Sequence, residues 1–293
     1  MTTTVAAPWT SAAFEEFLAT RNEPAWLTDR RRQAFAAYQE LLKQPLDPEE
    51  FKRIDLRGLR PEKFSLAGNG NSASLSTLMA NRADFGGTVS HIDGRAVASQ
   101  LRPELAAKGV VFGSWESVLA SRPEILQALE RAVPADTDRF SAWHTAFCTG
   151  GTVLYVPRNL QVDVPLYSLI GLATNGAADL SHTLVVLEEG ASATLLEETA
   201  SLDPNHTGLH VGAVELLVAP RAVLRYVQLQ NWGEKVWHLG HQAGRVANDA
   251  SLQWTVGGLG AKVAHIHQDI HLDGKGAAAE VNGVTFATDK QVL

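Results

Sequence analysis

The chain has a single cysteine, Cys148, among its 293 residues. One thiol excludes an intramolecular disulfide, a Cys-x-x-Cys pair and a cysteine-rich zinc site. It also excludes an iron–sulfur cluster held by four thiolates of this chain alone. Cys148 lies between Phe147 and the first of the predicted strands, so we expect its side chain to be buried as a small apolar group.

Long apolar segments are also missing. No window approaches about 18 uncharged apolar residues, the length that a membrane-spanning helix needs. The N-terminal residues MTTTVAAPWTSAAFEEF lack the basic start and the apolar core of a secretory signal. We therefore expect a cytoplasmic protein with no membrane partner.

Basic residues are in the minority. The formal net charge is -7 at pH 7, with 25 Lys and Arg against 32 Asp and Glu. Because binding to a phosphate backbone normally requires a basic face, no nucleic-acid partner is expected. The hydrophobic content of 45% and the charged content of 19% are typical of a folded globular protein.

The second half of the chain consists of short apolar stretches separated by small-residue corners. Between Phe147 and Leu293, four of these stretches turn on an alanine that follows a polar or glycine residue: Ala191, Ala222, Ala250 and Ala277. The intervals are 31, 28 and 27 residues, and a loose strand repeat of this length indicates stacked turns. A strand with one apolar face cannot bury that face alone, so we expect the strands to coil into a β-solenoid.

Alternation within these stretches supports strands. In AVLRYVQLQNW, one face carries Ala222, Leu224, Tyr226, Gln228 and Gln230, and the other carries Val223, Arg225, Val227 and Leu229. In LVVLEEGASATLLEE, Gly190 and the alternation after it favour two strands joined at a corner over one helix. The acid pairs Glu188–Glu189 and Glu197–Glu198 are expected to be solvated at such corners.

Helix signals dominate the first third. Ser11 and Thr28 are predicted to cap two helices, the second of which ends at Pro45. A capping-box pattern at Asp47, with Pro48 and Glu50, predicts a third helix.

The rest of the first half mixes both kinds of element. Two short strands are predicted at roughly 87–97 and 109–114, and a helix is predicted from Ser121 to about Val133. The sequence thus predicts a helical or mixed N-terminal domain over residues 1–140 and a solenoid over 141–293.

Two glycine-rich segments are not predicted to bind nucleotides. AGNGNSASL, from Ala67 to Leu75, is expected to be a loop because no strand precedes it. GGLGAK at 257–262 lacks the spacing of a phosphate loop, and Val263 stands where a Ser or Thr would bind magnesium. The chain also has no nucleophile elbow and no HExxH motif, so no enzymatic activity is predicted.

Five segments carry a resemblance to a known family. In order they are EPAWLTDRRRQAFAAYQEL (23–41), HTAFCTGGTVLYVPRNLQVDVPL (144–166), HTLVVLEEGASATLLEE (182–198), GAVELLVAPRAVLRYVQLQNW (212–232) and GKGAAAEVNGVTFATDKQ (274–291). Together they resemble the SufB/SufD family of iron–sulfur cluster assembly proteins. The single thiol and the absence of a cysteine-rich N-terminal stretch make SufD the closer resemblance.

The resemblance implies a mainly β fold, in which a right-handed parallel β-helix follows a helical or mixed N-terminal domain. It also implies a non-catalytic scaffold subunit that supports a SufB-like scaffold and a SufC-like ATPase. We expect no cofactor bound stably by this chain alone, and an iron–sulfur cluster only in the assembled complex.

The chain departs from the family at its C-terminal end. It stops where the family's last strands and its SufC-docking helices would begin, so we expect a truncated solenoid. The family's late cysteine and histidine, which are tied to cluster formation, have no counterpart here. Because an uncapped end exposes unpaired backbone groups, a homodimer or end-to-end association is expected in isolation.

Two other functions fit a solenoid. One is a carbohydrate-active parallel β-helix enzyme, although such enzymes are typically secreted and function does not follow from a fold. The other is a self-associating structural solenoid with no cofactor role. Capture of SufB-like and SufC-like partners, cleavage of a polysaccharide, or homo-oligomers alone would distinguish the three.

The segment HIHQDIH is a candidate for metal binding. If it is extended, His265, His267, Asp269 and His271 lie on one face at intervals of about 7 Å. Imidazoles and carboxylates can ligate zinc or iron, so His265, His267 and His271 are candidate ligands. Positions two apart on a strand do not easily reach one tetrahedral ion, so a polar outer strand face is the alternative.

The segment WHLGH is a candidate partner surface. It places His238 and His241 three residues apart, beside Trp237 and near Trp232. Tryptophan is enriched at binding hot spots, and we expect these four side chains to lie on a loop. The alternative is ordinary packing of a tryptophan at a corner of the solenoid.

Overall fold

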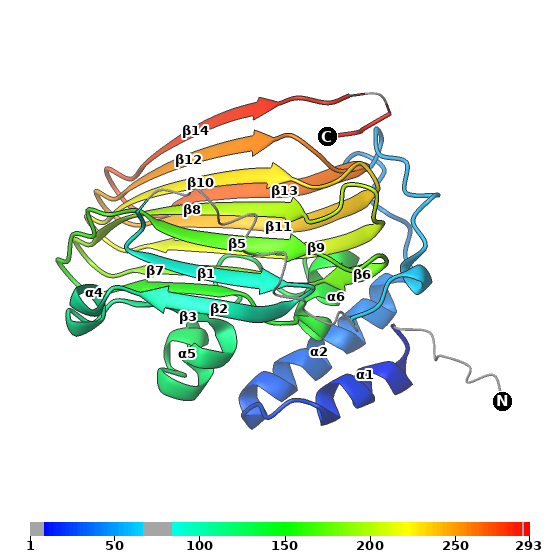
Figure 1. Cartoon of the computed structure of the whole chain (residues 1–293), viewed down its shortest axis with the longest axis horizontal. Helices are drawn as coiled ribbons and strands as arrows, with labels where there is room; N and C mark the ends of the chain where they lie inside the picture. Colours follow the sequence, from blue (N-terminus) through cyan, green and yellow to red (C-terminus); the bar gives the residue numbers. More distant parts are fainter. Residues whose placement is uncertain (1–8, 67–83, 289) are drawn as a thin grey trace.

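The computed structural model describes residues 9–66, 84–288 and 290–293. A β-solenoid of about five turns, spanning residues 153–285, follows a mixed region of helices and strands (Figure 1). The parallel β-solenoid predicted from the strand repeat is therefore confirmed. The predicted glycine-rich loop at 67–75 lies outside the described residues, and the division at residue 140 stays a prediction.

Two helices open the described chain, α1 (Ser11–Ala19) and α2 (Ala25–Leu41). The N-cap of α1 is Thr10, whose hydroxyl accepts a hydrogen bond from Ala13 N–H; Ser11, the predicted cap, is the first helical residue. Helix α2 begins directly after Pro24, so the predicted cap Thr28 lies in its first turn. No helix among the described residues is long and apolar enough to cross a membrane.

The predicted third helix is wrong. The carboxylate of Asp47 accepts the Glu49 N–H at 2.8 Å, which closes a local turn, and the next helical element is the short 3-10 helix η1 (Pro61–Lys63). Such side-chain-to-backbone bonds compete with helix formation.

A hairpin and a short helix follow. Strands β1 (Gly87–Ile92) and β2 (Arg95–Leu101) pair antiparallel, so the single strand predicted at 87–97 is divided by a turn. At that turn Asp93 and Gly94 have positive φ angles of 50° and 74°. Helix α4 (Pro103–Ala107) then leads to β3 (Val111–Ser114), the second predicted strand.

The helix predicted from Ser121 is misplaced. Ser121 ends α5 (Trp115–Ser121), and only the 3-10 helix η3 (Ile125–Ala128) follows. The N–H groups of Glu130, Ala132 and Val133 donate to the carboxylate of Glu215 instead. A distant side chain thus takes the place of the helical hydrogen bonds. The next helix is α6 (Arg139–Phe147), which has Asp138 as its N-cap.

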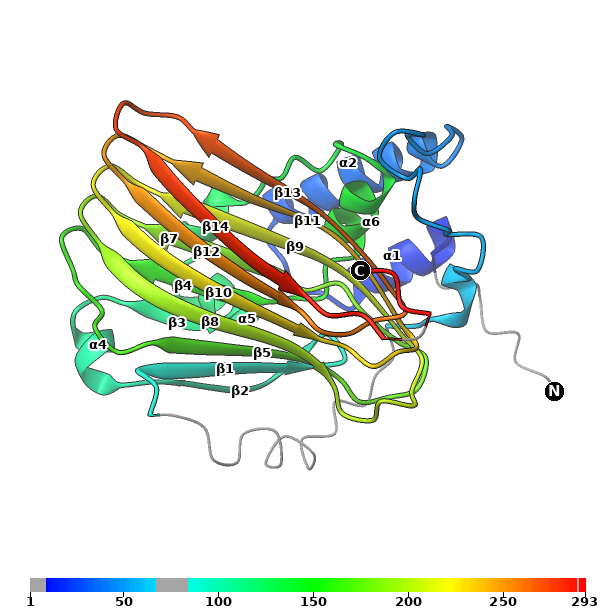
Figure 2. The ribbon, with the colours of Figure 1, turned by 90° about the horizontal axis from the view of Figure 1, so that it is seen from above.

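The solenoid winds its strands alternately into two sheets (Figure 2). The first sheet has the order β14-β12-β10-β8-β5-β1-β2 and the second has the order β13-β11-β9-β7-β4-β3, with β6 beside β9. The solenoid strands are β4 (Thr152–Val156), β5 (Leu166–Leu172), β6 (Ala177–Asp179), β7 (His182–Leu187), β8 (Ser192–Ser201), β9 (Gly208–Val218), β10 (Val223–Asn231), β11 (Val236–Val246), β12 (Ser251–Gly258), β13 (Val263–Leu272) and β14 (Ala278–Thr285).

The repeated alanines stack at one corner of the solenoid. The residues that follow them, Ser192, Val223, Ser251 and Ala278, are in register on β8, β10, β12 and β14. Each alanine N–H closes a turn onto the carbonyl three residues earlier. The residue before each alanine has a positive φ, as in Gly190 (69°) and Gly276 (73°). The sequence interval therefore marked true structural repeats.

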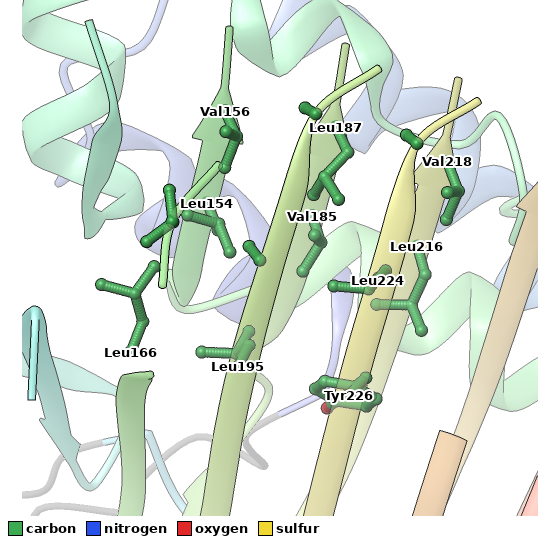
Figure 3. Packing of buried hydrophobic residues seen from close by; sticks show 14 of the residues in the cluster. Leu154, Val156, Leu166, Val185, Leu187, Leu195, Leu216, Val218, Leu224 and Tyr226 are labelled. Carbon is green, nitrogen blue, oxygen red and sulfur yellow. The ribbon is translucent and has the colours of Figure 1, made fainter. Parts of the chain in front are cut away.

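The interior between the sheets contains an apolar core (Figure 3). Leu195 and Leu224 of the first sheet point into it with Val185 and Leu216 of the second. The alternation predicted for β10 is confirmed, because Leu224, Tyr226, Gln228 and Gln230 are buried and the intervening residues are exposed or half-buried.

Helices cover the outer face of the second sheet. Phe140 and Trp143 of α6 pack with Leu209 of β9 and Leu239 of β11 in one apolar cluster. Helices α1 and α2 add further apolar side chains to this cluster, including Phe14. Most outward residues of β9 and β11 are therefore buried like the inward ones; Leu217, which is half-buried, and Arg245, which is exposed, are the exceptions.

Candidate functional site

Among the described residues, the last turn of the solenoid has an open strand edge in each sheet. β14 is the final strand of the first sheet and β13 is the final strand of the second (Figure 1). All eight residues of β14 are exposed. Large apolar side chains at this end are at least half exposed: Leu272 (54%), Val281 (50%), Val284 (63%) and Phe286 (66%).

Little of this edge is covered by the residues that the structure describes. Val292 pairs with Val263 at the beginning of β13, where the Ala264 N–H donates to its carbonyl at 2.7 Å. Within the described residues no strand pairs with the outer edge of β14. An exposed apolar strand with unpaired backbone groups is a surface for adding a partner strand. We define the open edge as residues 265–272 and 278–286 and treat it as the candidate partner interface.

A histidine and carboxylate cluster lies on the outer face of β13. Oε1 of Glu50 is 3.1 Å from Nε2 of His265 and 3.2 Å from Nδ1 of His267. Nε2 of His267 is in turn 2.9 Å from the carboxylate of Asp269. The predicted shared face of His265, His267 and Asp269 is therefore present. These contacts join the last strand of the second sheet to the turn that begins at Asp47.

In this cluster the carboxylate of Glu50 contacts two of the histidines that the sequence predicted as metal ligands. Among the described residues, no group of three or more His, Cys, Asp or Glu side chains is arranged to hold a metal ion. His271 is exposed, and in the described part of the chain no hydrogen bond or ion pair joins it to Glu50. Metal binding by His265, His267 and His271 thus stays a prediction.

The tryptophan and histidine patch is not on a loop. Trp237, His238 and His241 belong to β11, which lies between β9 and β13, and all three are buried. Trp237 packs beneath Lys262, whose ammonium is 4.8 Å from the ring centre. The expected loop position is wrong because WHLGH lies in a central strand that is covered on both faces. A partner role for these residues stays a prediction that no exposed surface supports.

Each of the remaining patch residues has an internal contact. Trp232 is buried with its ring 5.2 Å from that of His210. Nε2 of His241 lies 3.0 Å from Oδ1 of Asp138, the N-cap of α6. Burial alone would raise the pKa of Asp138, but His241 and the backbone donors of α6 outweigh it and lower that pKa. His241 therefore anchors α6 to the sheet.

The cysteine prediction is confirmed. Cys148 is 2% exposed, and its thiol contacts the Gly150 carbonyl at 3.4 Å. Burial raises the pKa of this thiol to about 11, so it stays protonated at neutral pH. A buried protonated thiol is a poor nucleophile and a poor metal ligand.

The expected solvation of the second acid pair is wrong. Glu197 and Glu198 are 2% and 6% exposed. Glu197 points inward and accepts hydrogen bonds from Thr183 and Tyr226, while Glu198 accepts one from Tyr167. Because both faces of β8 are covered here, each buried carboxylate needs a hydrogen-bond donor, and these donors lie on other strands of the solenoid. No local signal in the sequence identifies them.

Glu215 is a further buried carboxylate that sequence reasoning missed. Besides the three backbone N–H groups after η3, it lies 3.1 Å from Nε2 of His182. Burial alone would raise its pKa, but His182 and the backbone donors outweigh burial and lower the pKa below its ordinary value. The glutamate therefore holds the segment after η3 against β9 as a charged group.

Two sequence models of known families cover almost the whole chain. The model of the SufBD protein N-terminal region matches residues 13–167, which is more than half of the chain. The chain belongs to the SufBD family. The model of the SUF system FeS cluster assembly SufBD core domain matches residues 170–293, which contain most of the solenoid. The family match links the chain to the SUF system of iron–sulfur cluster assembly.

Curated relatives agree with the SufBD assignment. An iron–sulfur cluster assembly SufBD family protein of Staphylococcus saprophyticus is 29% identical over 214 residues, 73% of this chain and 46% of the relative. Similar proteins of Staphylococcus epidermidis and Staphylococcus aureus are 28% identical over the same share of each chain. The chain thus spans about half the length of the curated relatives it matches. These matches do not distinguish SufD from SufB.

Proposed function

We propose that the chain is a SufD-like, non-catalytic scaffold subunit of a cytoplasmic SUF assembly complex. The observation that carries this is the family match over both the N-terminal region and the solenoid. The state of Cys148 supports the SufD-like role over a cluster-carrying one, because its thiol is buried and protonated. The cluster would then be held only in the assembled complex.

The partners in this proposal are a SufB-like scaffold and a SufC-like ATPase. The open edge is the surface best suited to the SufB-like subunit, because a second solenoid could continue its sheets by strand addition. Val281, Val284 and Phe286 would be covered in such a contact. Burial of exposed apolar side chains favours association.

Affinity capture from the source cell tests this proposal. The tagged chain should retain SufB-like and SufC-like proteins, identified by mass spectrometry. A double variant, Val284→Lys with Phe286→Glu, should lose the SufB-like protein. Val223→Lys is the matched control, because Val223 is also an exposed apolar strand residue (44%) but lies on β10, away from the open edge. Capture of neither partner by the unmodified chain would contradict the proposal.

Self-association is the second candidate function, and the open edges of β13 and β14 favour it. Light scattering of the purified chain should then show a dimer or longer assemblies that the double variant reduces to monomers. If oligomers form and no SUF partner is captured, the structural solenoid is the better description. No feature of the described residues favours the carbohydrate-active alternative.

A further inference from the structure

A small enclosed chamber lies between the two sheets, in the turns formed by β7 to β11. Its lining includes Thr199, His210, Gln228, His238 and Gln242. The chamber has a free volume of 10 Å³. A cavity of roughly 10–15 Å³ on this scale holds one water molecule.

Two glycines help to make this space. Gly212 of β9 and Gly240 of β11 are paired in register, and both line the chamber. A Cβ atom on Gly212 would lie 2.3 Å from Nε2 of His210, and one on Gly240 would lie 2.6 Å from the Gly212 carbonyl oxygen. The imidazole of His210 therefore occupies the space into which a side chain at position 212 would project.

Three residues of the lining carry a buried polar atom with no hydrogen-bond partner in the described part of the chain. These atoms are Thr199 Oγ1, Gln228 Oε1 and His238 Nδ1, and their residues are 1%, 3% and 2% exposed. Buried polar groups in folded proteins are almost always paired, either with protein or with ordered water. Three unpaired groups around one water-sized space indicate a missing partner.

Other polar groups beside the chamber already have protein partners. Glu197 accepts hydrogen bonds from Thr183 and Tyr226, and Nδ1 of His210 lies 2.8 Å from the carboxylate of Asp179. These side chains therefore cannot easily turn to satisfy the three unpaired atoms.

A neutral His238 ring can accept a hydrogen bond from a water molecule. Burial and the neighbouring His210 hold the pKa of His238 well below its ordinary value, so its ring is neutral and one nitrogen can accept. The amide oxygen of Gln228 only accepts, whereas the hydroxyl of Thr199 can donate. One donor and two acceptors match the capacity of a water molecule.

We propose that this chamber binds one ordered water molecule, which pairs with Thr199, Gln228 and His238. The water accepts from the Thr199 hydroxyl and donates to Gln228 Oε1 and His238 Nδ1. The proton of His238 is then on Nε2. This water links β8 and β10 of the first sheet to β11 of the second through the interior of the solenoid.

A crystal structure of the full chain, at a resolution that shows ordered water, gives the direct test. One fully occupied water should lie about 3 Å from each of the three atoms. An empty chamber, or a water that contacts none of them, would overturn the proposal. The ¹⁵N chemical shifts of the His238 ring should show the proton on Nε2; a proton on Nδ1 would also contradict it.

Replacement of Thr199 provides a test in solution. If the water is present, Thr199→Val removes one of its partners and should lower the melting temperature by about 2–4 °C, while Thr199→Ser should keep the water. In a dry chamber, Thr199→Val would remove an unpaired hydroxyl and leave the melting temperature unchanged or higher. Thr255→Val is the control, because Thr255 is an exposed strand threonine remote from the chamber. If the Thr199→Val variant does not fold, the Thr199→Ser variant and the crystal structure test the proposal instead.

Discussion

The hydroxyl of Tyr226 on β10 donates a hydrogen bond to Oε1 of Glu197 on β8, 2.8 Å away. Thr183 donates to the other carboxylate oxygen. Both Tyr226 and Glu197 are buried inside the solenoid. Burial raises the pKa of Glu197 above its ordinary value, although the hydrogen bonds oppose this shift. Folding therefore disfavours the charged carboxylate relative to its state in the unfolded chain.

Replacement of Glu197 by Gln should preserve or increase stability at neutral pH. Because the folded pKa lies above the unfolded pKa, the folded state binds more protons between those two values, and the unfolding free energy of the native chain falls as pH rises through them. Gln does not titrate, so its advantage over Glu should grow from about pH 4 to about pH 7. Urea denaturation at both pH values measures this difference.

The control for this experiment is Glu234→Gln, since Glu234 is exposed. It should change stability little at either pH. A Glu197→Gln variant that loses stability at neutral pH, with its deficit shrinking as pH falls, would show that the folded state favours the charged carboxylate.

Much of the fold could be predicted because local sequence patterns that repeat in each turn determine it. The alanines at 191, 222, 250 and 277 occupy equivalent corners, and the two faces of β10 follow the alternation of its residues. Family resemblance was equally accessible, since it depends on the order of segments. Because the corners and the alternation recur in every turn, a wrong prediction for one turn can be recognised by comparison with the neighbouring turns.

The site could be predicted only in part, because its contacts are not local. His265 meets Glu50, a residue 215 positions earlier in the chain, and Glu215 organises backbone groups more than 80 positions before it. WHLGH has the composition of a surface patch, yet helices cover one face of its strand and the solenoid interior covers the other. Nothing within the segment indicates that covering.

Replacement of Glu215 by Gln should destabilise the chain by on the order of 1–3 kcal/mol. The variant loses a charged acceptor that serves three backbone N–H groups and faces His182. Because the pKa of Glu215 is lowered by folding, its stabilisation is present above the unfolded pKa and is lost as pH falls through the folded pKa. Chemical denaturation should therefore show the largest deficit near neutral pH, shrinking below about pH 4. An equal deficit at all pH values would argue against a charged Glu215.

Two glycines on inward strand positions should respond oppositely to alanine. Gly240→Ala places a Cβ 2.6 Å from a backbone oxygen, whereas in Gly283→Ala the nearest atom is 3.9 Å away. The backbone at Gly240 cannot move without disturbing the register with β9, so we expect a strong loss of stability there. Gly283→Ala should be neutral or slightly stabilising, because it reduces the freedom of the unfolded chain. Similar melting temperatures for the two variants would show that β11 has room to shift.

Loss of the Glu50 carboxylate should loosen the turn after Asp47 from β13. Glu50→Ala removes the acceptor shared by His265 and His267, while Glu49→Ala removes a neighbouring exposed carboxylate that makes no hydrogen bond or ion pair among the described residues. Hydrogen exchange of the backbone amides at 49–54 should be faster in Glu50→Ala alone. The effect on global stability should be small, because the cluster is partly exposed to solvent.

The same variants address metal binding at this cluster. Protein purified without a histidine tag should contain less than one metal ion per chain by elemental analysis, because Glu50 already occupies the space between the two imidazoles. One tightly held ion per chain, lost both in the His265→Ala/His267→Ala double variant and in Glu50→Ala but kept in Glu49→Ala, would instead make these three residues ligands. In that case the 3.1 Å and 3.2 Å contacts of Glu50 would describe a site ready to accept the ion.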